Sequence, residues 1–477
     1  MSQPGWSGSP SPVPLPPGYP HSSHPYSGPD APLPPLKRRT VWLLLALSAL
    51  LLVAGGVAGA PLFVPDVQYT FHAGTGPTAA GPARIEPTGP VPDVPTDPAN
   101  PDSAVDAILL RRTRAVLTQD RELFLADLDS SDPEFVRRQE RVFDNLTSLP
   151  FGEFAFRRQD GSYPQLARES GLPRAYAPRV TIEYAFEGFD QGTIAAPWVP
   201  LFAWRGNRWV IAGEASGDQL PDGTGAQVWD VSPILALSSE DVLLIVSEGQ
   251  ANTRALLDRA QQATETVQEF RQDGWSGRVV MIAVDDTLVY NSFWGRNETP
   301  PADVAAIAVE MFDGVWEWSD PVTLTETGYR IILNPDAFRE VSRASSLLLV
   351  HEITHVALGP ISTFTTPVWI AEGIAEYVAL EEEPVEEWIW PVRQAIEDGR
   401  LPSRLPDGQR FYDEPDINYT IGWLACRYIA SEYGEPTLLD YYERLGTEHV
   451  NTATEEVLGT SYDQLTDAIF DYIYSLV

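Results

Sequence analysis

The sequence predicts an α+β protein with two folded parts, the second mainly helical with a small sheet. Apolar residues recur at helical spacing after residue 103 and again after residue 341, and short β-branched and aromatic runs lie between these stretches. Segments rich in Pro and Gly interrupt the chain. A length of 477 residues leaves room for about two or three domains, while 43 prolines are more than a chain folded throughout would carry.

The chain is expected to begin with a tail and a membrane anchor. Residues 1–36 are dominated by Pro, Ser and Gly without hydrophobic periodicity, which is typical of a solvated tail. Within 37–64, the stretch 41–60 carries no charge, and about 20 apolar residues in a helix span a bilayer. Basic residues at 37–39 precede it. The positive-inside tendency therefore keeps the tail cytoplasmic and sends the rest of the chain across the cell membrane as a single-pass protein.

A cleaved signal peptide is the alternative, because Ala58-Gly59-Ala60 resembles a cleavage site. The long preceding segment, the length of the apolar run and Pro61 after the cut all favour the anchor. Residues 65–102 are again rich in Pro, Gly, Thr and Asp. We expect them to form a stalk that holds the folded part away from the membrane.

A first folded domain is predicted at 103–217. Its first half has apolar residues at helical spacing, and its second half holds strand-like runs at 180–186, 198–204 and 208–212. Two helices followed by a curved sheet resemble the NTF2-like α+β fold in order and size, without a shared motif. We therefore expect a binding or spacer module and carry no catalysis over to it.

A second domain is predicted at 231–477, after a linker at 218–230 that is rich in Gly and Asp. It is expected to begin with mixed secondary structure and to end helical. The predicted strands are 279–284 and 330–333, and the predicted helices are 241–271, 301–313 and most of the chain after 341.

A metal-binding pattern lies on the first of these late helices. Ser342 can cap a helix that continues to Gly359-Pro360, where Gly takes the left-handed conformation and Pro forbids continuation. His351 and His355 are four residues apart, so both imidazoles leave one face of the helix at the spacing of two zinc ligands. Glu352 lies beside that face and is placed to accept a proton from water that the metal activates.

A third ligand is expected from a second helix. The pattern with a third histidine six residues after the second fails, since Ile stands at 361. Thr366 and Pro367 predict the start of a helix that carries Glu372 and Glu376 on one face. Glu372 would complete a His2Glu zinc site with one open position. Glu376, one turn later, is suited to accept the free N–H of a ligand histidine, His351 by preference.

These motifs resemble those of the gluzincins, and within them the peptidase-MA-like group. His351–His355, the stretch 369–377 and the later stretches 418–434 and 454–462 carry the resemblance, which covers about 328–477. It implies a mainly helical zinc peptidase fold with a small sheet and the metal between two helices. It also implies an edge strand that pairs with the substrate backbone, for which 329–333 is the candidate, and a tyrosine or histidine that stabilises the oxyanion, for which Tyr419 is the candidate.

Charge and cysteine content exclude other classes. A net charge of −35 repels phosphate, so nucleic-acid binding is set aside. Cys426 is the only cysteine, which excludes an intramolecular disulfide, and its apolar helical surroundings predict a buried thiol. The acidic run 381–387 is expected to be a solvated turn, and a weaker alternative is that it attracts basic peptides.

The sequence therefore predicts a membrane-anchored, extracytoplasmic zinc metallopeptidase that acts on peptides or proteins. Glu352 and Tyr419 are its expected catalytic residues, and Zn²⁺ is its expected cofactor. One rival is a non-catalytic extracellular binding or assembly module with a degenerate peptidase fold. Another is a zinc hydrolase with a non-peptide substrate, because the motif specifies activation of water rather than the bond that is cleaved.

Overall fold

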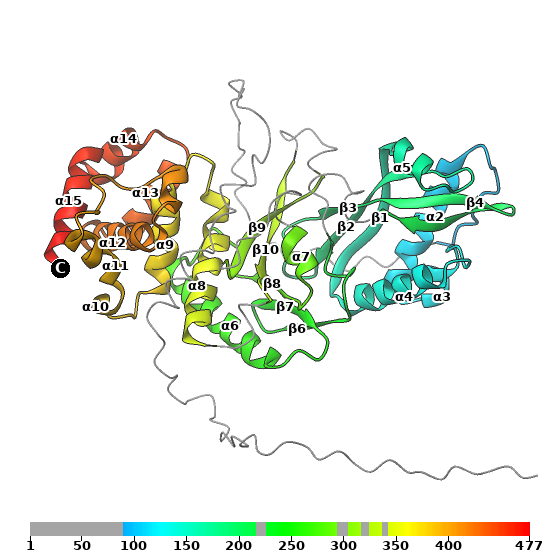
Figure 1. Ribbon diagram of the computed structural model, residues 1–477, viewed down its shortest axis with the longest axis horizontal. Coiled ribbons are helices and arrows are strands. Elements are labelled where there is room, and N and C mark those ends of the chain that lie inside the picture. Colours follow the sequence, from blue (N-terminus) through cyan, green and yellow to red (C-terminus); the bar gives the residue numbers. More distant parts are fainter. Residues whose placement is uncertain (1–88, 216–225, 293–303, 316–323, 336–341) are drawn as a thin grey trace, which may run out of the picture. The chain divides into compact units, whose positions relative to one another are not determined.

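Across the residues that the structure describes, the protein combines helices with three β-sheets, a mixture of α and β structure that is compatible with the predicted α+β class. Figure 1 shows the computed structural model, which describes residues 89–215, 226–292, 304–315, 324–335 and 342–477. The predicted tail 1–36, the anchor 37–64 and most of the stalk lie outside these described residues.

The first folded part begins with helices and continues with strands, in the order that the sequence predicts. Its three-stranded antiparallel sheet has the order β1-β2-β3, and β4 and β5 form a separate hairpin. Two strands that the sequence did not predict, β1 and β3, pair with β2. The helices are α2 (Pro101–Thr118), α3 (Arg121–Leu125), α4 (Pro133–Ser148) and α5 (Pro164–Glu169), and the strands are β1 (Phe151–Ser162), β2 (Pro178–Phe186), β3 (Ile194–Trp198), β4 (Pro200–Arg205) and β5 (Arg208–Glu214).

The second folded part starts with a five-stranded sheet of order β6-β7-β8-β10-β9. Strands β7, β8 and β10 run parallel, whereas β6 and β9 pair antiparallel with their neighbours at the two edges. The strands are β6 (Ile234–Ser238), β7 (Val242–Ser247), β8 (Val279–Ala283), β9 (Ala306–Phe312) and β10 (Glu326–Leu333), so the predicted strands at 279–284 and 330–333 are confirmed.

One predicted helix is confirmed only in its second part, and another is wrong. The chain from 241 to 271 contains β7 followed by helix α6 (Thr253–Phe270), and the predicted helix 301–313 contains β9. Every residue of β7 is buried, because the sheet is covered on both faces, and such a strand reads as a continuous apolar run like a buried helix. The apolar residues of β9 are compatible with a helix or with a strand. The segment forms a strand because β9 pairs with β10 along the whole length of β9.

The rest of the second part is helical, as predicted for the chain after 341. Figure 1 shows α8, α9 and α12 side by side, and α9 contacts both of the others. The elements are α7 (Thr287–Ser292), α8 (Arg343–Leu358), η3 (Gly359–Ile361), α9 (Val368–Ala379), α10 (Val385–Trp388), α11 (Trp390–Glu397), η4 (Gly408–Tyr412), α12 (Pro415–Tyr433), α13 (Glu435–Leu445), α14 (Val450–Ala453), η5 (Thr454–Leu458) and α15 (Tyr462–Ser475).

Two hydrophobic cores lie on opposite faces of the five-stranded sheet. On β7, Val242, Leu244 and Val246 point into the core formed with α6, α8, α9 and α12, whereas Leu243 and Ile245 point into the other core. This second core also contains the apolar side chains of α2, α4 and strands β1 to β5. The sheet that precedes α8, the helix with the two predicted histidine ligands, is therefore packed against the first folded part.

The described end of the predicted linker is buried in this shared core. Trp229 has 1% of its surface exposed and contacts the rings of Phe151 and Tyr184, with centroid separations of 6.3 and 5.2 Å. Residues 218–225 lie outside the described part of the chain. All described residues belong to one compact unit, and the two predicted folded parts share a core.

A buried ion pair ties the two parts together. Arg330 of β10 donates from Nη1 and Nη2 to the two carboxylate oxygens of Asp190 over 2.6 and 2.8 Å, and both side chains are 1% exposed. Asp190 lies in the loop after β2. Its neighbour Gln191 donates its backbone N–H to the carbonyl oxygen of Thr327, over 3.1 Å. The first part therefore holds the start of β10 in place.

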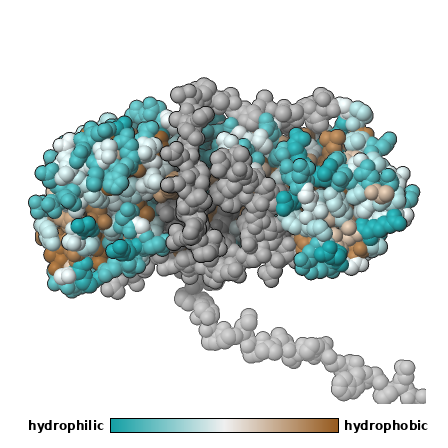
Figure 2. Space-filling view, turned by 90° about the horizontal axis from the view of Figure 1, so that it is seen from above, coloured by the Kyte–Doolittle hydropathy of each residue, from teal (hydrophilic) through white to brown (hydrophobic). Residues whose placement is uncertain are grey.

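One described helical stretch, Arg343–Ile361, is long and apolar enough to cross a membrane, but 78% of it is buried in the protein. It contains α8, and its place in the core accounts for its composition. Figure 2 shows hydrophilic side chains over most of the described surface on the face drawn, in keeping with the high net charge. The predicted membrane span at 41–60 is outside the described residues.

Candidate metal centre

Helix α8 carries the two histidines and begins where the sequence predicts. The Ser342 hydroxyl accepts the backbone N–H of Ser345, while the Ser345 hydroxyl accepts the N–H of Ser342, over 3.3 and 2.7 Å. The predicted left-handed Gly359 is wrong, since its φ is −44° and a 3₁₀ turn follows. Glycine is needed for a different reason, because a Cβ at this position would lie 2.2 Å from the hydroxyl oxygen of Tyr329.

Helix α9 carries the two glutamates and starts at Val368, two residues after the predicted cap. Thr366 does not cap it. Its hydroxyl accepts the N–H of Thr363 over 3.0 Å, and the carboxylate of Asp407 instead accepts the N–H of Val368 over 2.7 Å. Asp407 is distant in sequence, so the local pattern around Thr366 could not indicate this cap.

Two glycines bring α9 and α12 together. A Cβ at Gly373 would lie 2.4 Å from the carbonyl oxygen of Gly422, and a Cβ at Gly422 would lie 2.6 Å from the carbonyl oxygen of Trp369. The backbones therefore touch without side chains between them, one residue after Glu372 on α9. This contact sets the distance between Glu372 and the residues that α12 contributes to the site.

The structure places the three predicted ligand atoms at the corners of a small triangle. Nε2 of His351 and Nε2 of His355 are 3.0 Å apart, and each lies 3.5 Å from Oε2 of Glu372. A tetrahedral zinc ion with bonds of about 2.0–2.1 Å holds its ligand atoms about 3.3–3.4 Å apart. The donor types and their spacing therefore fit a zinc ion. All three side chains are buried, with exposed fractions of 0, 2 and 2%.

The electrostatics of the triangle also favour a cation. Oε2 of Glu372 is buried and accepts no hydrogen bond, although it faces both imidazoles. Among the described residues, only the imidazoles form ion pairs with Glu372 and Glu376. Burying two carboxylates without a Lys or Arg partner costs free energy of folding. A divalent ion would neutralise their negative charge and offset this cost.

The pKa values respond to the same negative charge. Burial acts to lower the pKa of His351, but its contacts with Glu372 and Glu376 outweigh burial and raise this pKa to about 10. Burial lowers the pKa of His355 and raises that of Glu376, whereas the two imidazoles hold the pKa of Glu372 below its usual value despite burial. The two carboxylates therefore make His351 a stronger base than an ordinary histidine.

Glu376 lies where the sequence predicts a partner for His351. Its Oε1 is 3.4 Å from Nδ1 of His351, on the side of the ring away from the triangle, and its side chain is fully buried. A carboxylate near Nδ1 favours the tautomer that carries hydrogen there, which leaves the lone pair of Nε2 directed at the metal position.

The two predicted catalytic side chains are also buried at the site. Glu352 is 0% exposed, and its charge affects both His351 and Tyr419. Tyr419 belongs to α12, is 0% exposed, and has its ring centroid 6.3 Å from that of His351. Its hydroxyl has no hydrogen-bond partner in the described part of the chain. Burial, followed by the charge of Glu372, raises the pKa of Tyr419 well above its ordinary value, so this hydroxyl remains a donor.

Sequence reasoning missed Tyr412. This residue ends the short turn η4 and hydrogen-bonds the carboxylate of Glu372. Its ring packs edge-on against Phe411, which in turn packs against Tyr419, at centroid separations of 5.4 and 4.9 Å. No local pattern marks Tyr412, because η4 is a loop segment brought to the site by the packing of α9 and α12.

The predicted substrate-pairing strand is not at a sheet edge. The stretch 329–333 belongs to β10, which is hydrogen-bonded on one side to β8 and on the other to β9. It is therefore an inner strand of the sheet, and no free edge is available to it for an added strand. The strand at that edge is β9, which also contacts α8.

Two smaller expectations have different outcomes. Cys426 is buried as predicted, and burial raises the pKa of its thiol well above the ordinary value. The acidic run 381–387 is only partly a solvated turn. Glu383 accepts from Arg343, the first residue of α8, over 3.1 Å and from the indole N–H of Trp388 over 3.2 Å. This carboxylate therefore helps to fix α10 against the start of α8, the helix that carries His351 and His355.

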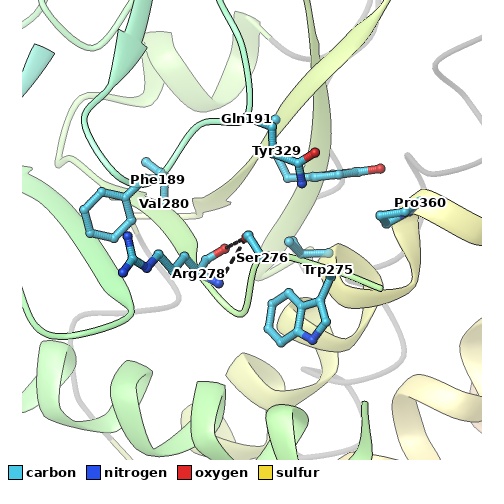
Figure 3. Close-up of a pocket in the computed structure, with 10 residues that line it drawn as sticks. Phe189, Gln191, Trp275, Ser276, Arg278, Val280, Tyr329 and Pro360 are labelled. Carbon is cyan, nitrogen blue, oxygen red and sulfur yellow. Dashed lines mark hydrogen bonds between the residues drawn. The ribbon is translucent and has the colours of Figure 1, made fainter. Parts of the chain in front are cut away.

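A separate cavity lies near the C-terminal end of α8, where Val356 and Pro360 line it. Figure 3 shows Trp275, Arg278, Phe189 and Tyr329 around it, with Pro360 at one side. Arg278 donates to the carbonyl oxygen of Gly188 over 2.6 Å. None of the predicted metal ligands or catalytic residues lines this cavity.

Comparison with known proteins adds no assignment to this geometry. Neither a protein-family model nor a curated protein sequence matches the chain. The site therefore rests on its own residues: two imidazole nitrogens and one carboxylate oxygen converge in a buried, negatively charged position between α8 and α9.

Proposed function

We propose that the protein is a membrane-anchored, extracytoplasmic zinc metallopeptidase of the gluzincin type. The observation that carries this proposal is the triangle formed by His351, His355 and Glu372, with distances of 3.0, 3.5 and 3.5 Å. Two histidines and one glutamate form the ligand set of catalytic zinc sites that leave one position open to water.

The residues fit zinc by donor type, spacing and charge, as the unpartnered Oε2 of Glu372 indicates. A zinc ion held there would polarise a water molecule and lower its pKa from 15.7 to about 7. Glu376 then orients His351 through Nδ1, at 3.4 Å, and stabilises the positive charge of the site.

Glu352 is the general base of the proposed reaction. It follows His351 directly on α8 and is fully buried beside it. In peptide hydrolysis its carboxylate accepts a proton from the attacking water and delivers it to the amine nitrogen as the C–N bond breaks. The carboxylate therefore ends the cycle in its starting state.

Tyr419 is the proposed donor to the substrate carbonyl oxygen. Its hydroxyl remains protonated and makes no hydrogen bond among the described residues. A donor fixed by a helix before the reaction can stabilise negative charge as it develops on that oxygen. Packing against Phe411, at a centroid separation of 4.9 Å, holds the ring in place.

The substrate backbone is proposed to pair with β9. This strand ends the five-stranded sheet and contacts α8, whereas β10 has no free edge. An extended peptide added to an edge gains main-chain hydrogen bonds without selecting a particular side chain. The tail 1–36 and the anchor 37–64 would place this site outside the cell membrane, on the side opposite the basic residues 37–39.

A second candidate function is a non-catalytic binding or assembly module whose fold is stabilised by a metal. The burial of the site favours it, since His351, Glu352, His355 and Glu372 are at most 2% exposed. A structural zinc site needs no access for substrate, but it takes four protein ligands, whereas the group found among the described residues offers three. Activity therefore has to distinguish the two functions.

Cleavage of a peptide library by the wild-type protein and by the Glu352→Gln variant tests the proposal. We expect cleavage by the wild type, and a loss of at least about 100-fold in the variant with zinc retained, because the general base alone is removed. Equal activity of the two proteins would refute the mechanism. Absence of peptide cleavage with a zinc-loaded wild type would favour the binding module, or a non-peptide hydrolase if that protein cleaves another bond.

A further inference from the structure

Tyr412 joins the metal site from outside the two ligand helices. It is the last residue of η4, a turn between α11 and α12, and its side chain is half-buried with its hydroxyl on the carboxylate of Glu372. A tyrosine hydroxyl beside an ionised carboxylate donates its hydrogen, so Glu372 is the acceptor.

The turn that carries Tyr412 is fixed at both ends. Asp407 caps α9 by accepting the N–H of Val368 over 2.7 Å, one turn before Glu372. Asn418 of α12 donates to the carbonyl oxygen of Phe411 over 2.8 Å. The segment 407–412 is therefore attached to the helix that holds Glu372 and to the helix that packs against it.

Aromatic packing fixes the ring as well as the backbone. Tyr412 packs edge-on against Phe411 at 5.4 Å, Phe411 packs against Tyr419 at 4.9 Å, and Tyr419 approaches His351 at 6.3 Å, all measured between ring centroids. This aromatic row begins at Tyr412 and ends at a ligand histidine. Little freedom is left for the Tyr412 hydroxyl, so its hydrogen bond is preorganised.

The two oxygens of Glu372 have separate tasks. Oε2 lies 3.5 Å from the Nε2 atom of each imidazole and accepts no hydrogen bond. These are the properties expected of an oxygen that binds a metal. This leaves Oε1 for the Tyr412 hydroxyl. A carboxylate held through one oxygen presents the other at a fixed position and loses less rotational freedom when it binds a metal.

We propose that Tyr412 is a positioning residue for Glu372, which holds Oε2 of this carboxylate toward His351 and His355 and so increases the affinity of the site for zinc. This inference rests on the proposed zinc site. Tyr412 affects the affinity for zinc and takes no part in the proposed peptide hydrolysis, because its hydroxyl acts through Glu372. Removal of a hydrogen-bond partner of a metal ligand typically weakens metal binding about 10–100-fold.

The test compares zinc dissociation constants of the full-length wild type, Tyr412→Phe and Tyr176→Phe, measured by competition with a chelator after removal of metal. Tyr176→Phe is the matched control, because it also removes a tyrosine–carboxylate hydrogen bond, the 2.7 Å bond to Asp102, in the first folded part. We expect the dissociation constant to rise about 10–100-fold in Tyr412→Phe and to stay unchanged in the control.

Cobalt(II) provides a second measurement, because its visible absorption reports coordination geometry. The cobalt spectrum of Tyr412→Phe should differ from that of the wild type, while the Tyr176→Phe spectrum should not. Wild-type zinc affinity and an unchanged cobalt spectrum in Tyr412→Phe would overturn the inference and leave the zinc site intact. A wild type that binds no zinc would instead overturn the proposed function, together with the inference that depends on it.

Discussion

Gly373 of α9 and Gly422 of α12 meet backbone to backbone, so that a Cβ at Gly373 would lie 2.4 Å from the carbonyl oxygen of Gly422. The contact is rigid on both sides, because each atom belongs to a helix backbone. It also lies one residue from Glu372, the proposed third ligand. The spacing of these helices therefore determines where Glu372 and Tyr419 stand relative to the two histidines.

Gly373→Ala is expected to destabilise the protein by about 1–3 kcal/mol or more, because the added methyl group forces α9 and α12 apart. Urea unfolding measures the change. Gly213→Ala is the control, since its Cβ would meet only Leu201 at an ordinary distance of 3.8 Å. A Gly373→Ala protein as stable as the control would show that the two helices can separate without cost.

Glu376→Gln is expected to weaken zinc binding about 10–100-fold, because the amide no longer stabilises the Nδ1 hydrogen of His351 as a carboxylate does. Chelator competition measures the dissociation constant. Glu435→Gln is the matched control. Glu435 accepts a hydrogen bond over 2.7 Å from Tyr377, which lies on the same helix as Glu376, and Glu435 is not in contact with the proposed ligands. Equal zinc affinity in both variants would remove Glu376 from the metal site.

Arg330→Met is expected to destabilise the protein by about 3–5 kcal/mol, since it leaves Asp190 charged and buried without its partner. Combining it with Asp190→Asn should recover part of this loss, because the remaining group is then neutral. Chemical denaturation of the three proteins measures the coupling between the two positions. A loss of less than about 0.5 kcal/mol in the single variant, the range typical of surface substitutions, would show that the pair does not hold β10 to the first folded part.

Asp129→Asn should change how stability depends on pH. Burial acts to raise the pKa of Asp129, but hydrogen bonds from Arg205 and Ser131 outweigh it, so the pKa lies below its ordinary value of 3.8. A lowered pKa in the folded state contributes stability above that ordinary value and loses it as the pH falls through the folded-state pKa. Wild type should therefore exceed the variant in stability at about pH 7, and the difference should shrink in acid. A difference independent of pH would contradict the assignment.

The histidine helix could be predicted because its signals are local. The cap at Ser342, the four-residue spacing of His351 and His355 and the stop at Gly359-Pro360 all lie within one stretch of sequence. Only the reason why residue 359 must be glycine was not predicted. It is the close approach of Tyr329, which belongs to β10 and not to the helix. Glu372 and Glu376 were likewise identified from one helix face, and the structure brings them to the predicted histidines.

Features that depend on distant pairing could not be predicted. The sequence predicts a helix where β9 lies because its apolar spacing suits both structures, and only its pairing with β10 distinguishes them. The same pairing removes the edge that was expected at 329–333. Tyr412 and Asp407 reach the site from a turn whose sequence carries no helix, strand or ligand pattern. Their roles depend on tertiary contacts alone.

The zinc content of the purified full-length protein tests the proposed metal centre most directly. Elemental analysis of freshly purified wild type should give about one zinc ion per chain, as three converging ligands require. His355→Ala should lose most of it, because the triangle then keeps only two ligand atoms. Less than about half an equivalent in the wild type, with no uptake on addition of zinc, would contradict the proposed metal centre.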